Sequence, residues 1–128
     1  MLATKEKIQL EFVINSSPGV LFNRLSTPSG LSEWFADDVD LAQNVFTFKW
    51  HTDQQQAVEV LRKDNKIIRF RWLDEEDEEL YFEFSIVTEV ISGINALVIT
   101  DFCDPEDKDD TIELWTKQVD ILKRGLGI

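Results

Sequence analysis

The chain has 128 residues, of which 43% are hydrophobic, and its formal net charge is −12. This length is typical of one domain with its own apolar core, so we expect a single domain over residues 1–128. The acidic balance disfavours nucleic acid and anionic membranes as partners, and one cysteine, no signal-like start and no bilayer-length apolar run predict a cytoplasmic protein.

The first third of the chain predicts one strand followed by two short helices. Residues 7–14 alternate between apolar and polar side chains, which is typical of a half-buried strand. Ser17-Pro18 and Thr27-Pro28 each place a hydroxyl residue before a proline, a common start of a helix. We therefore expect a short helix after Ser17 and a second one running through Leu31 to Phe35.

The middle of the chain predicts a meander of strands. Strands are expected at residues 45–50, 56–63, 67–72, 80–87 and 95–103, with about six strands following the helices. The sequence leaves open which face of the last strand points into the interior. Either Leu97, Ile99 and Asp101 or Ala96, Val98, Thr100 and Phe102 line the interior, and the charge of Asp101 favours an outward position for it.

The last segment predicts one long helix. It starts at Asp104-Pro105 or nearer Asp109, and Gly125 and Gly127 are stop signals. Its apolar side chains recur at intervals of three and four, which places them on one face. A curved antiparallel sheet needs an apolar cover, and this helix is the one expected element long enough to supply it. The apolar side chains on this face of the helix are Ile112, Trp115, Val119, Leu122 and Leu126.

This order of elements resembles the START-like (SRPBCC, helix-grip) superfamily, and within it the group named for the activator of Hsp90 ATPase. The resemblance implies an α+β helix-grip fold, with two short helices after strand 1 and the C-terminal helix across the concave face. It also implies a cavity between sheet and helix that binds apolar molecules in related domains, some of which are cyclases or similar enzymes. The motifs are Ser17-Pro18, Val20-Leu21-Phe22, Leu25-Ser26-Thr27-Pro28, Leu31-Ser32-Glu33-Trp34-Phe35, Ile68-Arg69-Phe70-Arg71-Trp72, and Leu114-Trp115 to Leu122-Lys123.

Large side chains on the expected inward faces are the candidate ligand site. They either surround a cavity or fill a solid core, and both interpretations remain open. In the first case the indole N–H groups would orient a bound molecule. The candidates are Trp34, Phe35, Phe46, Phe48, Trp50, Val60, Phe70, Trp72, Phe82, Phe84, Trp115 and Val119.

The sequence predicts no catalytic or metal-binding set and no cofactor. His51 is expected in an exposed turn, and Cys103 lies among acidic residues that disfavour its thiolate. The acidic run 74–79 is expected to be a solvated hairpin loop, because it lacks the spaced oxygen ligands and glycine of a calcium loop.

The outer face of the sheet is expected to carry cross-strand ion pairs. Arg69 and Arg71 point outward if Phe70 points inward, and Glu59 and Glu83 are predicted beside them.

The function predicted first is non-catalytic binding of a small, mostly apolar molecule between the sheet and the C-terminal helix. The alternative is a protein-interaction module, either chaperone-linked or self-associating as a homodimer. A second alternative is a cyclase-like enzyme, which requires a titratable group with a perturbed pKa inside the cavity.

Overall fold

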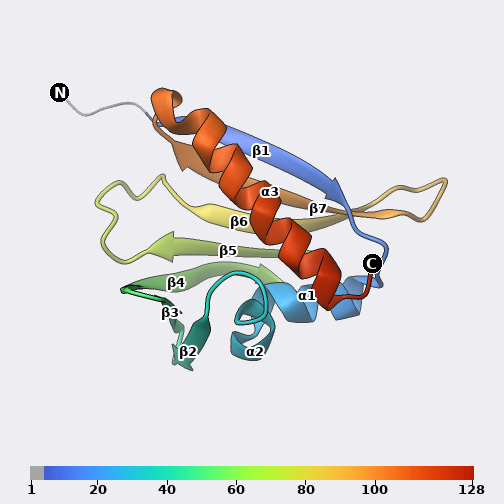
Figure 1. Ribbon diagram of the computed structural model, residues 1–128, viewed down its shortest axis with the longest axis horizontal. Coiled ribbons are helices and arrows are strands. Elements are labelled where there is room, and N and C mark those ends of the chain that lie inside the picture. The colour runs from blue at the N-terminus through green and yellow to red at the C-terminus, as the bar shows by residue number, and fades with distance from the viewer. Residues whose placement is uncertain (1–4) are drawn as a thin grey trace.

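A computed structural model describes residues 5–128 of the chain (Figure 1). Within this range, antiparallel strands form one seven-stranded sheet in the order β1-β7-β6-β5-β4-β3-β2. The strands are β1 (Glu6–Val13), β2 (Asp38–Ala42), β3 (Val45–Trp50), β4 (Asp53–Lys63), β5 (Ile67–Trp72), β6 (Phe82–Thr88) and β7 (Asn95–Cys103). The helices are α1 (Pro18–Ser26), α2 (Pro28–Leu31), the 3-10 helix η1 (Pro105–Asp107) and α3 (Lys108–Gly125).

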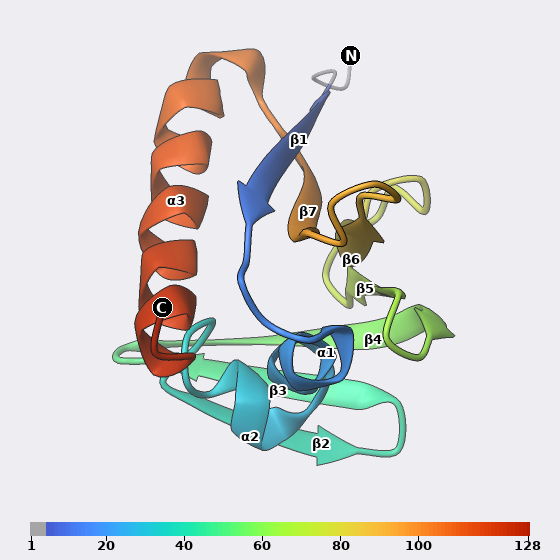
Figure 2. The same ribbon diagram turned by 90° about the vertical axis from the view of Figure 1, so that its right-hand side faces the viewer.

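The sheet curves around the three α-helices. Figure 2 shows α3 along one side of the concave face, while α1 and α2 lie at one end of it. This arrangement confirms the α+β helix-grip fold predicted from the sequence. None of the helices in residues 5–128 combines the length and the apolar composition needed to cross a membrane.

The two short helices begin where the sequence predicts. The Ser17 hydroxyl accepts a hydrogen bond from the Val20 N–H at 3.3 Å, and the Thr27 hydroxyl accepts one from the Gly30 N–H at 3.0 Å. These bonds satisfy backbone donors that have no partner within a helix. The predicted length of the second helix is wrong, because α2 ends at Leu31 and the chain continues in turns.

Strands β2 and β4 differ most from the sequence expectation, and β6 starts at Phe82 rather than at Leu80. The short edge strand β2 was not predicted, because only Val39 of its five residues is buried and its alternation is therefore weak. Strand β4 starts at Asp53 and contains a bulge between Glu59 and Leu61, which shifts the side-chain alternation.

The bulge moves Val60 out of the interior. Its side chain is 51% exposed, so the prediction that Val60 lines the inward face is wrong. Ala57 takes the inward position instead, opposite Phe46 and Trp72. A bulge adds one residue to a strand, so alternation read from the sequence fails on its far side.

The outer face carries one of the expected cross-strand ion pairs. Arg69 Nε lies 2.8 Å from Glu83 Oε1, and the Arg69 guanidinium lies 4.0 Å from the centre of the Tyr81 ring. The prediction for Glu59 is wrong. Its carboxylate pairs with Arg62 at 3.1 Å, because the register of β4 places it opposite Phe70 rather than beside the outward arginines.

Candidate functional site

Six phenylalanine rings fill the space between the sheet and the helices, and we call them the aromatic interior. Each is at most 4% exposed. Ring centroids lie 4.9 Å apart for Phe35 and Phe48, and 4.9 Å apart for Phe70 and Phe82. Such spacing is direct contact, so these side chains occupy the middle of the predicted cavity. The members are Phe35, Phe46, Phe48, Phe70, Phe82 and Phe84.

A pocket of about 350 Å³ opens at the edge of the aromatic interior, and we call it the rim pocket. Its lining residues come from the segment after α2, the end of β3 and one side of α3. Trp34, Phe35 and Trp50 of the predicted ligand set form part of its wall. The full lining is Ser32, Glu33, Trp34, Phe35, Ala36, Asp37, Trp50, Gln118 and Ile121.

Hydrogen bonds fix the wall of the rim pocket in place. The Phe35 carbonyl accepts a bond from Trp50 Nε1 at 2.9 Å and another from Gln118 Nε2 at 3.2 Å. Trp34 Nε1 donates to the Arg24 carbonyl at 2.7 Å. Three elements therefore converge on the segment after α2. Because the indole N–H groups of Trp34 and Trp50 already donate to backbone carbonyls, other polar groups of the pocket would have to orient a bound molecule.

The charged groups of the rim pocket are carboxylates. Glu33 forms an ion pair with Arg24 at 2.7 Å, while Asp37 is exposed. No lysine, arginine or histidine is among the lining residues. The pocket therefore presents aromatic and aliphatic surface beside negative charge, which disfavours an anionic ligand.

Asp101 lies on β7 under α3 and is not among the residues that line the rim pocket. Its carboxylate accepts hydrogen bonds from Trp115 Nε1 at 2.9 Å and from the Phe102 N–H at 2.8 Å. Leu97 and Ile99 on the same strand face are fully buried. The face containing Leu97, Ile99 and Asp101 thus points inward, and the expectation of an outward Asp101 is wrong.

The environment of Asp101 changes its acidity. Burial raises the pKa of its carboxyl group above the ordinary value of 3.8, and the hydrogen bonds from Trp115 and Phe102 oppose that rise. Burial has the larger effect because α3 covers a carboxylate that water would otherwise solvate. The bond to Trp115 nevertheless connects β7 directly to α3.

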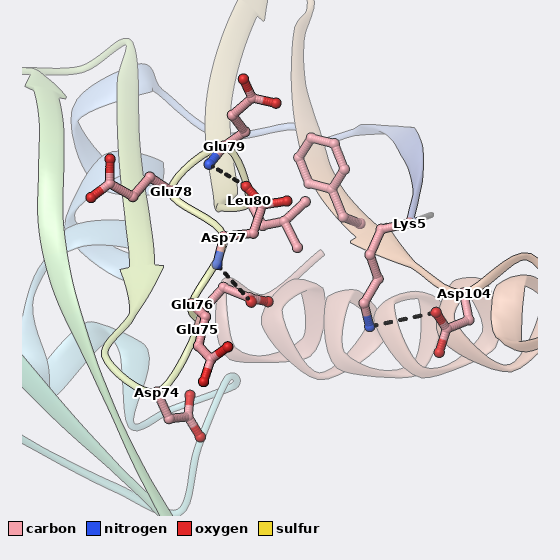
Figure 3. Close-up of a pocket in the computed structure, with 10 residues that line it drawn as sticks. Lys5, Asp74, Glu75, Glu76, Asp77, Glu78, Glu79, Leu80 and Asp104 are labelled. Carbon is pink, nitrogen blue, oxygen red and sulfur yellow. Dashed lines mark hydrogen bonds and ion pairs between the residues drawn. The ribbon is translucent and has the colours of Figure 1, made fainter. Parts of the chain in front are cut away.

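The acidic run forms the wall of a broad basin between the β5–β6 loop and the start of β1 (Figure 3). Its volume is about 1270 Å³, and Lys5 is its one basic residue. Backbone N–H groups of Asp77 and Glu79 donate to Glu75 and Asp77 carboxylates at 3.2 and 2.9 Å. These local bonds order the loop from within, in agreement with the hairpin loop predicted from the sequence. The lining is Lys5, Asp74, Glu75, Glu76, Asp77, Glu78, Glu79, Leu80, Phe102 and Asp104.

Other titratable groups do not form a catalytic arrangement in the described part of the chain. His51 is exposed in the turn between β3 and β4, and Cys103 is buried at the end of β7. Asp104, Glu106 and Asp107 place carboxylate oxygens within 4.8 Å of one another at the start of η1. Glu106 and Asp107 are exposed, and acidic residues are favourable at a helix start, so this cluster has a structural explanation.

The structure divides the predicted ligand set between two places. Phe46, Phe48, Phe70, Phe82 and Phe84 lie in the aromatic interior, and Trp72, Trp115 and Val119 pack against it. Only Trp34, Phe35 and Trp50 reach the rim pocket. Sequence reasoning missed Gln118 and Ile121. Their signal was positional, because Gln118 lies three residues after Trp115 and four before Leu122, beside the apolar stripe of α3, and Ile121 lies three residues after Gln118.

The sequence and the fold were compared with those of known proteins. A family model described as a START-like superfamily domain matches residues 2–128. No curated protein matches the sequence. The solution structure of BfR322 from Bacteroides fragilis is 42% identical, with a TM-score of 0.69, and the match covers 97% of this chain and 93% of that one.

Two more distant structures share the fold. The Aha1 dimer from Colwellia psychrerythraea is 16% identical, with a TM-score of 0.79 over 96% of this chain and 97% of that one. MLL2253 from Mesorhizobium loti is 15% identical, with a TM-score of 0.78 over 95% and 97% of the two chains.

Proposed function

Because the chain belongs to the START-like superfamily, we propose that it binds a small, mostly apolar molecule, and that the rim pocket is the binding site. Domains of this superfamily commonly bind ligands. The proposal differs from the sequence-based one in location, since the aromatic interior is occupied by its own rings.

The observation that carries the proposal is an open pocket walled by aromatic side chains beside a fully buried cluster of rings. Its volume of about 350 Å³ lies at the lower end of the range for small-molecule sites, roughly 300–1,000 Å³. A ligand of this size would contact Trp34, Trp50 and Ile121 with its apolar part. Burial of that apolar surface would supply the main driving force for binding.

The polar groups of the pocket narrow the class of ligand. Asp37 and the paired Glu33 lie at the wall, and Gln118 offers an amide oxygen that accepts hydrogen bonds. A neutral or cationic molecule with a hydrogen-bond donor at one end fits this lining. A fatty acid or another carboxylate would meet like charge without a compensating cation.

The direct test is binding of a neutral apolar fluorophore, N-phenyl-1-naphthylamine, to the purified protein. We expect saturable fluorescence enhancement, with the Ile121→Trp variant lowering affinity at least about tenfold because the larger ring fills the pocket. Native mass spectrometry of the unmodified protein as purified would reveal any carried molecule as extra mass that is lost on denaturation.

Leu114→Trp is the matched control, because Leu114 is 58% exposed on the same helix and outside the pocket, while Ile121 is 45% exposed. Equal affinities of the two variants would place the fluorophore elsewhere and overturn the rim pocket as the site. Absence of saturable binding to the unmodified protein and of any carried mass would overturn the binding function.

Self-association as a homodimer is a second candidate, favoured by a free sheet edge in this structure. The distant relative from Colwellia psychrerythraea is described as a dimer. Dimer formation and ligand binding use different surfaces, so each can be tested without the other.

A further inference from the structure

Strand β1 is an edge of the sheet over its whole length. Its eight residues pair with β7 on one side, and no other strand in residues 5–128 pairs with it. Proteins usually protect such edges with proline, bulges or short length, because unpaired backbone groups can bind another strand. Strand β1 has none of these three features. Its charged side chains, among them Lys7 and Glu11, discourage pairing with most strands, so a partner strand must carry complementary charges.

The register shows which backbone groups point away from the sheet. Val13 lies opposite Ala96, so Ile14 lies opposite Asn95, and the Ile14 N–H donates to the Asn95 carbonyl at 3.0 Å. Hydrogen-bonded and non-hydrogen-bonded pairs alternate along an antiparallel ladder. Even-numbered residues of β1 therefore bond to β7. Odd-numbered residues, from Lys7 to Val13, direct their N–H and C=O groups to the free edge.

The charges on these odd-numbered residues are self-complementary. Lys7 and Glu11 are exposed on the outer face, at equal distances from Gln9. Neither makes an ion pair within the described residues. Suppose that two copies of β1 pair antiparallel about a two-fold axis at Gln9. Lys7 then lies opposite Glu11 of the partner subunit, and Glu11 lies opposite Lys7 of the partner subunit.

We propose that β1 is a homodimer interface, in which two copies join through their free edges into one continuous sheet with Gln9 on the two-fold axis. This register satisfies the outward backbone groups of both strands and forms two identical ion pairs. An isologous interface requires this property, since one surface must complement itself. The occupant of the edge is a second copy of this chain.

The inner side of β1 agrees with the same register. Ile8 lies opposite Leu10 of the partner subunit, and both are apolar. Leu10 and Phe12 are half-buried in the single chain, where they pack against the core from the edge of the sheet. A partner strand would cover their remaining exposed surface. In the same register Phe12 lies opposite Glu6 of the partner subunit, so apolar pairing on this face is limited to Ile8 and Leu10.

The opposite edge of the sheet lacks this complementarity. Strand β2 is shorter, and Asp38 and Asp40 alternate along it. Pairing two copies about Asp40 would place like charges directly opposite each other, which is destabilising. Asp40 is also engaged with Lys49 at 2.8 Å. The comparison of the two edges assigns self-pairing to β1.

The test is a charge exchange followed by sedimentation equilibrium at moderate salt. Lys7→Glu or Glu11→Lys alone converts both ion pairs into repulsive contacts, so each should raise the dimer dissociation constant about tenfold or more. An equimolar mixture of the two variants should form a heterodimer with near-original affinity, because every position 7 then opposes the opposite charge at position 11. Circular dichroism of each single variant checks that the monomer fold is retained.

A disulfide experiment tests the position of the axis independently. Residues that face each other in a hydrogen-bonded pair have Cα atoms about 5.5 Å apart, within the range that a disulfide spans. Gln9→Cys should therefore form a covalent dimer under mild oxidation. Glu11→Cys is the matched control on the same strand face and should form no covalent dimer, because position 11 lies opposite position 7 and the two introduced thiols would lie far from each other.

A chain that is monomeric at millimolar concentration would overturn the proposal. So would a dimer that neither charge exchange weakens, or a pair of variants that fails to associate on mixing. Loss of association in each variant alone, recovery on mixing and a disulfide at position 9 would together establish the interface.

Discussion

The aromatic interior and the rim pocket are built from neighbouring residues but differ in what closes them. In the interior, rings from β3, β5 and β6 contact one another, and Phe35 stacks on Trp115 of α3 with 5.7 Å between centroids. At the rim, the Phe35 carbonyl accepts one hydrogen bond from Trp50 and one from Gln118. Dense ring packing leaves no room for a ligand, whereas a few polar anchors leave an open wall.

The largest effect expected from this comparison follows removal of an interior ring. Phe82→Ala should lower the free energy of unfolding by about 3–5 kcal/mol, because Phe82 contacts Phe70 and Trp72 with centroids 4.9 and 4.7 Å away. Ile121→Ala at the rim should change it by only about 0.5 kcal/mol, since that side chain is partly in water already. Urea unfolding measures both, and similar losses would contradict the distinction.

A smaller effect is expected where the rim is anchored. Gln118→Leu removes one of the two hydrogen bonds to the Phe35 carbonyl, and it should cost about 0.5–1.5 kcal/mol. The Trp50 bond remains, so the segment after α2 should loosen without unfolding. Hydrogen exchange should become faster at Phe35 and Ala36 and stay unchanged at Phe82 and Phe84. Faster exchange throughout would show that rim and interior open together.

The smallest effect concerns pH and the interior beneath α3. The native carboxyl of Asp101 has a raised pKa, so the folded state binds its proton more tightly than the unfolded chain does. Its contribution to stability is therefore fully present below pH 3.8 and is lost as pH rises through the native pKa.

Asp101→Asn isolates this contribution because asparagine does not titrate. The stability of the unmodified protein minus that of the variant should fall as pH rises from about 4, by roughly 1 kcal/mol or less for a half-buried group. Thermal unfolding across this pH range measures the difference. A difference that rises with pH would show that the Trp115 bond, rather than burial, controls the carboxyl group.

Local signals in the sequence predicted the fold well. Ser17-Pro18 and Thr27-Pro28 start α1 and α2, and Gly127 adopts a positive φ of 77° just after α3. Such features depend on a few adjacent residues, so they can be recognised without a structure. The periodicity of α3 likewise identified Trp115, Val119 and Leu122 as its buried face.

Features that depend on distant contacts could not be predicted. The bulge at Val60 is a property of the β4–β5 pairing, and nothing in the strand's own sequence marks it. The inward position of Asp101 depends on a hydrogen-bond partner in another element, Trp115. The rim pocket combines three segments, and its polar member Gln118 lies outside the aromatic pattern that suggested a ligand site.

The pairing of β1 with β7 also governs the order in which the chain can assemble. Glu6 pairs with Cys103, so β1 can find its partner only after the ribosome has made the roughly 90 residues up to β7. Until then Ile8, Leu10 and Phe12 have no sheet to cover them. Closing so long a loop is entropically costly, and contacts distant in sequence slow folding. In a nascent chain β1 therefore stays without a sheet partner until β7 has been made, and truncation before β7 leaves β1 unpaired.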